Sequence, residues 1–242
     1  MALTLGEPQL RIGSIEASLA QRVLQAGLPL RSARAQCQVL APEDASLAAI
    51  AKWLNANGIA GPWREELLAV TDEQLRPVAC VERAAARALG ITTFAVHLVA
   101  SRSDAGVWVQ QRAQNKATDP GLWDTTMGGQ VGAGESVLQA LERETREEAG
   151  LSLAQLHGLT ECERIIIRRP VVQAQTQGYM VEHIAVFEAT LAEAVIPVNQ
   201  DGEVQRFECL SPQELLVRLQ GEHFTLEAAL IMAQALQRRG VL

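Results

Sequence analysis

The sequence has few cysteines, and they are widely scattered along the chain. Cys37, Cys80, Cys162 and Cys209 are its only cysteines, and none belongs to a C-x-x-C motif. Zinc sites usually draw paired cysteines from such motifs, so this spacing disfavours a zinc site. We expect a cytoplasmic protein, in which cysteines scattered in this way are reduced core residues.

The chain also lacks a basic excess and a long apolar run. Its formal charge of −7 argues against broad binding to nucleic acids or anionic membranes. No stretch approaches the length of a membrane span, and residues 1–18 do not follow a basic start with an apolar run, as a signal peptide does. We expect a monomer or homodimer with neither nucleic acid nor membrane as a partner. The content of 48% hydrophobic residues is ample for a folded core.

What the chain does have is a concentration of acidic residues in residues 129–151, GQVGAGESVLQALERETREEAGL. Ser136, followed three residues later by Gln139, is typical of a capping box at the start of a helix. Gly150 is a natural C-terminal stop, because glycine tolerates the left-handed conformation found there. The pattern predicts a helix over Val137–Ala149.

The spacing of the acids within this helix predicts a cation site. Residues three and four apart lie on one side of a helix, so Glu144, Glu147 and Glu148 share a face and repel one another. A solvated acidic face explains Glu142 but not Glu148, because an unpaired carboxylate on the core-facing side is expensive. That core-facing, less polar stripe consists of Val137, Leu138, Leu141, Thr145 and Ala149. Ligation by carboxylate oxygens suits Mg²⁺ and also Mn²⁺.

The same segment resembles the Nudix box. The matching positions are Gly129, Glu135, Arg143-Glu144, Glu147-Glu148 and Gly150-Leu151, and Thr145 departs mildly from a usually hydrophobic position. The resemblance implies an enzyme that uses Mg²⁺ to cleave a diphosphate linked to another moiety. It implies that Glu144, Glu147 and Glu148 hold metal and act in catalysis, with the carbonyl of Gly128 as a further ligand. Gly129, Glu135, Arg143 and Gly150 would brace the loop–helix–loop.

Phosphoryl chemistry is consistent with these roles. Metal ions screen a diphosphate's charge and acidify a bound water, so the protein contributes mainly positioning. The sequence has no G-x-S-x-G elbow and no P-loop lysine pattern that would indicate a competing mechanism. Glu144 or an acid outside the box would help to deprotonate the water; Glu203 is a candidate for that acid and Glu182 a poorer one.

The pattern of the chain changes near residue 90. Residues 1–90 are expected to form a small α+β domain that recognises the substrate, with helices over 14–26, 45–57 and 78–89 and a short strand over 67–70. Residues 91–242 are expected to form an α/β domain, and the resemblance implies an α/β/α sandwich with a mixed sheet. Its expected strands are 94–99, 107–111, 163–168, 179–189 and 204–210, and its closing helices are 212–219 and 225–239.

Segments outside the box resemble one Nudix subgroup. The W-R-x-E-L segment from Trp63, the E-R-A-A segment from Glu82 and the K-x-x-x-P-G-x-x-D loop from Lys116 are similar to Nudix proteins with an extra N-terminal domain, which are associated with thiamine pyrophosphokinase-like proteins. The resemblance implies hydrolysis of thiamine diphosphate, or its oxidised forms, to the monophosphate. Leu68 stands where members often carry tyrosine, which puts identical ring recognition in doubt.

Several side chains are candidates for substrate contacts. Arg112 and Lys116 are placed to grip the diphosphate, Arg as a bidentate fork and Lys as a point charge, or are simply solvated. Trp63 and Trp123 are candidates to stack on a thiazolium ring, although core packing is the commoner role of tryptophan. Arg64 and Glu66 either face the site or pair at a domain interface. His97, in an expected strand, is interpreted as structural.

Three other functions remain open. The loop after Lys116 also resembles isopentenyl diphosphate isomerases, which carry Cys and His before a degenerate box, where this chain has Met127-Gly128-Gly129-Gln130 before an intact one. A nucleotide-directed Nudix hydrolase is equally compatible with the box, because the box addresses the diphosphate and not the attached group. A non-catalytic metabolite-sensing module is the third alternative, against which the intact acids argue.

Overall fold

The computed structural model describes residues 1–6, 9–104, 106–173 and 176–242, which fall into two compact units. Unit 1 comprises residues 1–94, 132–134 and 166–183. Unit 2 comprises residues 95–131, 135–165 and 184–242. Three long strands therefore contribute residues to both units. Among the described residues, none of the helices is both long enough and apolar enough to cross a membrane.

Unit 1 contains a four-stranded sheet and a separate β-hairpin, both packed against helices. The sheet has the strand order β2-β1-β4-β3, and β5 pairs with β6 in the hairpin. Helix α2 contacts β4, β6 and α3, so it links the sheet to the hairpin through a continuous apolar core. The elements are β1 (Ala2–Leu5), β2 (Leu10–Ser14), α1 (Ala17–Gln25), β3 (Leu30–Ala33), β4 (Gln36–Val39), α2 (Glu43–Ala56), β5 (Leu67–Thr71), β6 (Pro77–Glu82) and α3 (Arg83–Ala86).

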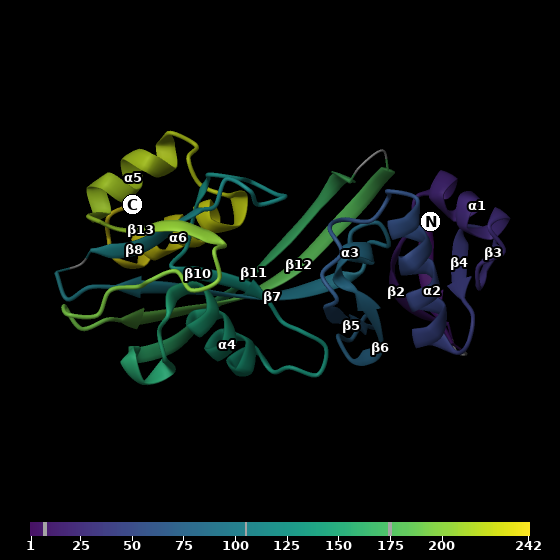
Figure 1. Cartoon of the computed structure of the whole chain (residues 1–242), viewed down its shortest axis with the longest axis horizontal. Helices are drawn as coiled ribbons and strands as arrows, with labels where there is room; N and C mark the ends of the chain where they lie inside the picture. The colour runs from purple at the N-terminus through teal and green to yellow at the C-terminus, as the bar shows by residue number, and fades with distance from the viewer. Residues whose placement is uncertain (7–8, 105, 174–175) are drawn as a thin grey trace. The chain divides into compact units, whose positions relative to one another are not determined.

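The second sheet carries the α/β/α arrangement. Its strand order is β11-β12-β7-β8-β13, with β10 paired to β7 and β9 paired to β8. Helix α4 packs on β10, whereas α5 and α6 pack on β13 and β9, and Figure 1 shows α4 on one side of these strands with α5 and α6 on the other. The elements are β7 (Thr92–Ser101), β8 (Val107–Arg112), β9 (Trp123–Asp124), β10 (Met127–Gln130), α4 (Val137–Ala149), η1 (Leu153–Gln155), β11 (His157–Gln173), β12 (Thr176–Thr190), β13 (Val204–Leu210), α5 (Pro212–Gln220) and α6 (Leu226–Arg238).

The expected α/β/α fold is confirmed, and the expected helix over Val137–Ala149 is present with those bounds. The helix expected over 78–89 is wrong. Residues Pro77–Glu82 instead form a strand paired with β5, in which Val81 lies opposite Leu68, and only Arg83–Ala86 is helical. Both side chains of that pair are buried, so burial against the neighbouring strand outweighs the helix propensity of the alanine-rich sequence.

Candidate active site

Helix α4 positions the acidic residues, and its ends are set by local sequence. The Ser136 hydroxyl accepts a hydrogen bond of 3.3 Å from the Gln139 backbone N–H, and the Gln139 side chain accepts one of 2.8 Å from the Ser136 N–H. This is the expected capping box. Gly150 ends the helix with a φ of 64°, the left-handed conformation that glycine tolerates. Of the expected core stripe, Leu138 is instead exposed.

Glu148 is the buried acid of this helix. It is 4% exposed and lies with Leu141, Thr145 and Ala149 on the face of α4 that meets the core. The Gln110 side-chain amide and the Gly128 backbone N–H donate hydrogen bonds of 3.0 and 3.1 Å to its Oε2. Because both bonds end on Oε2, Oε1 is the oxygen left to a ligand.

The electrostatic environment of Glu148 favours a bound cation. Burial, and after it the negative charge of Glu144, raises the pKa of Glu148 to about 8. The hydrogen bonds from Gln110 and Gly128 and the positive charge of Lys116 oppose this rise. Two carboxylates that repel each other in a desolvated place form a donor set for a hard divalent ion such as Mg²⁺. The residues present therefore fit the implied metal.

Neighbouring side chains lie so close to the backbone at Gly129 and Gly128 that an added Cβ would clash with them. A Cβ on Gly129 would lie 2.0 Å from Cδ of Glu144, and a Cβ on Gly128 would lie 2.5 Å from Cε1 of His97. Neither glycine has a positive φ. The absence of a side chain at 129 therefore lets the Glu144 carboxylate rest against strand β10.

Arg143 connects the segment that precedes α4 to the helix itself. Its guanidinium pairs with Glu135 at 2.9 Å, with Glu144 at 2.7 Å and with Glu147 at 3.3 Å. It also donates a hydrogen bond of 3.0 Å to the backbone carbonyl of Gln130. These charge-assisted bonds raise the pKa of Arg143, chiefly through Glu135. The bracing role implied for Glu135 and Arg143 is consistent with this network.

The three acids that the sequence groups together are held differently in the structure. Glu148 is buried, Glu144 is directed to Arg143, and the Glu147 side chain is 46% exposed. In the described part of the chain, no three His, Cys, Asp or Glu side chains lie close enough together to hold a metal ion. Arg143 donates to Oε1 of Glu144 and to Oε2 of Glu147, so it holds one oxygen of each carboxylate. Their metal-binding roles stay predictions.

Arg112 is bound to its own loop. Its guanidinium donates to the carbonyls of Thr118 and Asp119 at 3.0 and 3.2 Å and pairs with Asp124 at 3.2 Å. Lys116 pairs with Glu203, and its charge reaches Glu148. Of the two predicted diphosphate contacts, Lys116 is therefore the one whose charge lowers the pKa of Glu148, and Glu203 is paired with it.

Trp123 is buried between polar neighbours rather than presented to a ligand. Its ring is 6% exposed, and the guanidinium carbons of Arg206 and Arg218 lie 5.4 and 4.4 Å from its centroid. A substrate ring would have to displace one of these cations, and the predicted stacking role remains a prediction.

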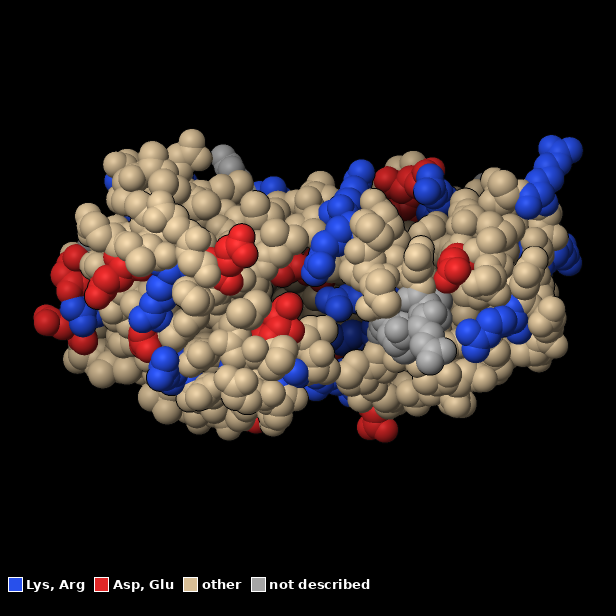
Figure 2. Space-filling model, turned by 90° about the horizontal axis from the view of Figure 1, so that it is seen from above, with Lys and Arg blue, Asp and Glu red and all other residues tan. Residues whose placement is uncertain are grey.

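Figure 2 shows acidic and basic side chains interspersed on the visible face of unit 2.

The remaining candidate residues outside the box lie in unit 1; they are Trp63, Arg64, Glu66 and Glu182. Trp63 lies at the surface, and the Arg64 backbone N–H donates to Glu82 at 3.1 Å. Glu66 pairs with Arg83 at 2.6 Å within the same unit. Glu182 is also in unit 1, where it accepts a hydrogen bond of 2.9 Å from Thr93.

Sequence reasoning missed Gln110 and Asp124. Gln110 is 2% exposed and directly follows the three apolar residues that begin β8, and a buried amide in such a position is the signal that points to a polar partner. Asp124 accepts from Arg112, and its Oδ1 lies 3.7 Å from Nδ1 of His97. His97 is buried, and its Nδ1 is 2.8 Å from Oγ1 of Thr125, which is consistent with the structural role expected for it.

Comparisons with known proteins agree with this geometry. A family model described as NUDIX domain matches residues 91–230. A protein of Arabidopsis thaliana named Nudix hydrolase 20, chloroplastic, is 30% identical over 208 residues, which cover 82% of this chain and 54% of that protein. An uncharacterized protein of Saccharomyces cerevisiae is 28% identical over 197 residues, which cover 76% of this chain and 57% of that protein. The chain spans about half the length of these two relatives.

A solved structure shows the same fold. The crystal structure of DR0079 from Deinococcus radiodurans superposes with a TM-score of 0.53 at 22% identity, covering 70% of this chain and 98% of that one. The family model spans more than half of the present chain and includes the whole acidic segment from Gly129 to Leu151. The chain therefore belongs to the NUDIX domain family.

Proposed function

We propose that this chain is a Mg²⁺-dependent diphosphohydrolase that cleaves a diphosphate linked to another moiety, with Mn²⁺ as an alternative ion. The observation that carries the proposal is the placement of Glu148, buried on α4 with Oε2 bonded to Gln110 and Gly128 and with Glu144 close enough to raise its pKa. A buried acid in this state is stabilised by a cation. The bound metal supplies charge neutralisation and an acidified water.

The protein side chains divide the remaining work. Glu148, Glu144 and Glu147 are the residues that would hold the metal through carboxylate oxygens. Lys116, paired with Glu203, places a positive charge beside the acids and is the residue that contacts the diphosphate. Glu203 is the acid outside the box that orients or deprotonates the attacking water.

We propose thiamine diphosphate, or an oxidised derivative, as the substrate, and the monophosphate as the product. The support is the resemblance of the Trp63, Glu82 and Lys116 segments to the thiamine-associated Nudix subgroup. The similarity to the Arabidopsis protein covers 82% of this chain, more than residues 91–242 contain, so it extends into residues 1–90. We therefore propose that residues 1–90 recognise the substrate, with Trp63 and Arg64 as contacts. We place the activity in the cytoplasm, in a monomer or homodimer.

The test is a substrate panel with the wild-type chain, Glu148→Gln and the matched control Glu142→Gln, whose side chain lies on the exposed face of α4. The panel contains thiamine diphosphate, its oxidised analogues, nucleoside di- and triphosphates, ADP-ribose and isopentenyl diphosphate, each with Mg²⁺ or Mn²⁺. The measurements are phosphate release and chromatography of the organic product. We expect thiamine compounds to rank first and only Glu148→Gln to lose turnover.

Other outcomes overturn separate parts of the proposal. If nucleotides or ADP-ribose rank with thiamine compounds, the substrate assignment fails and the reaction stands. Formation of dimethylallyl diphosphate without phosphate release would show an isomerase. Metal-independent binding with no turnover of any compound would show a sensing module.

A further inference from the structure

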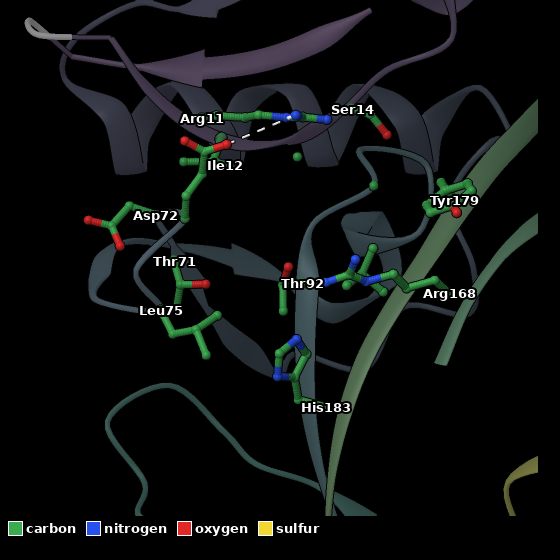
Figure 3. A pocket seen from close by; sticks show the side chains of 14 residues that line it. Arg11, Ile12, Ser14, Thr71, Asp72, Leu75, Thr92, Arg168, Tyr179 and His183 are labelled. Carbon is green, nitrogen blue, oxygen red and sulfur yellow. Dashed lines mark ion pairs between the residues drawn. The ribbon is translucent and has the colours of Figure 1, made fainter. Parts of the chain in front are cut away.

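Unit 1 contains a cavity of about 710 Å³ that the proposed hydrolase site does not use. Four separate parts of the unit form its walls: strand β2, the turn after β5, the start of β7, and the paired strands β11 and β12. Figure 3 shows side chains from all of these segments around one space. A volume of this size lies within the range of small-molecule sites, which is roughly 300–1,000 Å³.

Thr71 supplies a buried hydroxyl without a partner in this cavity. The residue is 4% exposed, and no described group hydrogen-bonds to its Oγ1. The register between β5 and β6 shifts next to Thr71, because Val70 pairs with Ala79 and Thr71 with Pro77. In Figure 3 the hydroxyl points toward the side of the cavity where Thr92 and Arg168 lie. A buried hydroxyl without a partner is costly, and a ligand atom would remove that cost.

Arg168 gives the cavity a positive charge that no carboxylate in the described part of the chain pairs with. The two acids of the cavity are already paired, Asp72 with Arg76 at 2.6 Å and Glu73 with Arg11 at 4.0 Å. Arg168 lines the same cavity, its guanidinium extends toward Thr92 in Figure 3, and no described carboxylate pairs with it. A planar guanidinium binds phosphate or carboxylate oxygens in bidentate fashion.

We propose that this cavity binds a small organic anion, held by Arg168 through a phosphate or carboxylate group and by the hydroxyls of Thr71 and Thr92. Tyr179 and Leu75 provide apolar walls for the carbon skeleton of the ligand. All of its lining residues belong to unit 1, and none of them is among the residues assigned to metal or substrate in the proposed hydrolase site.

The single tyrosine of the chain gives a direct reporter, because Tyr179 lines the cavity. The full chain is labelled selectively with ¹³C-tyrosine, freed of metal on a chelating resin, and kept in a cationic buffer. It is then titrated with glycerol 3-phosphate, glycerate or glycerol and followed by NMR. We expect the Tyr179 signal to shift saturably with one or both anions and not with glycerol. The stronger of the two anions identifies the headgroup.

Variants decide whether the site is the one described. Arg168→Gln is expected to weaken binding about tenfold or more, and Thr71→Val by several-fold, because each removes a hydrogen-bonding group from the anion. Arg164→Gln is the control, since this arginine lies on the same strand and pairs with Glu161. Arg168 is exposed, so its variant tests the site even if Thr71→Val fails to fold.

Three results would each overturn the proposal: no saturable shift with either anion, an equal response to glycerol, or unchanged affinity in Arg168→Gln. Hydrolase activity is measured separately with Mg²⁺, so failure of this proposal leaves the proposed function unaffected, and the reverse also holds.

Discussion

The Glu144 carboxylate occupies the place where a side chain on Gly129 would begin. A Cβ there would lie 2.0 Å from Cδ and 2.2 Å from Oε1 of Glu144. Since the φ of Gly129 is not positive, the requirement for glycine at this position comes from the acid and not from the backbone. As the side chain of Glu144 is placed, the space between strand β10 and helix α4 at Gly129 is filled by its carboxylate.

Gly129→Ala is expected to push Glu144 away from β10 and to lower kcat/KM about 100-fold, the scale expected when a reacting group is misplaced by about 1 Å. Steady-state hydrolysis with Mg²⁺ measures the loss. Gly134→Asn is the control, because Gly134 has a φ of 79° that asparagine tolerates and no atom within 4 Å of an added Cβ. Equal activity of Gly129→Ala and wild type would show that Glu144 need not lie against β10.

The stability of the metal-free chain is expected to fall as pH rises from about 5 to about 8. Burial raises the pKa of Glu148 from 4.5 to about 8, so within this window the folded state holds a proton that the unfolded state has lost. Folding therefore binds protons there, and the free energy of unfolding decreases with pH. Urea denaturation across the window measures the slope.

Glu148→Gln removes the titrating group and should flatten that slope, whereas Glu142→Gln, on the exposed face, should leave it unchanged. Mg²⁺ should stabilise wild type most at the upper end of the window, where the ion replaces the proton. A slope in Glu148→Gln as steep as in wild type would assign the pH dependence to other groups.

Gln110→Leu is expected to weaken Mg²⁺ binding or activity about 10- to 100-fold, the usual range for residues that orient a metal ligand. Its amide donates the hydrogen bond of 3.0 Å that holds Oε2 of Glu148. Loss of this bond should also raise the pKa of Glu148, because the bond favours the charged form. The Mg²⁺ dependence of turnover and its pH profile test both effects. Gln111→Leu, one residue along the strand, is the control; its amide binds the Gly121 carbonyl instead.

Arg143→Lys is expected to destabilise the chain by about 1–2 kcal/mol, since an ammonium cannot bridge three carboxylates and a carbonyl, and partial exposure limits the loss. Urea denaturation measures this change. Arg146→Lys is the matched control on the exposed face of α4. Arg143→Lys and Arg146→Lys should differ; identical unfolding midpoints would mean that the Arg143 network adds nothing to stability.

Arg112→Lys is expected to loosen the loop between β8 and β9 with little change in Mg²⁺ affinity. The guanidinium holds the carbonyls of Thr118 and Asp119 together with Asp124, and lysine cannot replace all three contacts. Amide hydrogen exchange over residues 113–122 should become faster. Arg164→Lys, whose side chain pairs with Glu161, serves as the control. Unchanged exchange in Arg112→Lys would leave Arg112 available for the diphosphate role expected from the sequence.

Prediction from sequence succeeded where the decisive interactions are local. The capping box of Ser136 and Gln139 and the stop at Gly150 act within one helical turn, and α4 has the expected bounds. The strand Val204–Leu210 likewise has the expected bounds. Prediction failed at residues 78–89, where a strand pairing opposite β5 overrides an alanine-rich helical pattern. The contacts of Trp123 were also not predictable, because they depend on Arg206 and Arg218, which lie far from it in the chain.

The sequence alone determined the helix that carries the acids, the glycines beside it and the family to which the chain belongs, because caps, periodicity and motif spacing act over a few residues. The helical spacing also placed Glu148 toward the core, where it is buried. The tertiary structure decided which amide holds Glu148 and which arginine binds Glu144 and Glu147. Gln110 and Glu148 are 38 residues apart in the chain and meet only because β8 and α4 pack in one core. Thr71 and Arg168, 97 positions apart in the numbering, line one cavity for the same reason. Burial and long-range contact set these energies, and neither is encoded in any short stretch of sequence.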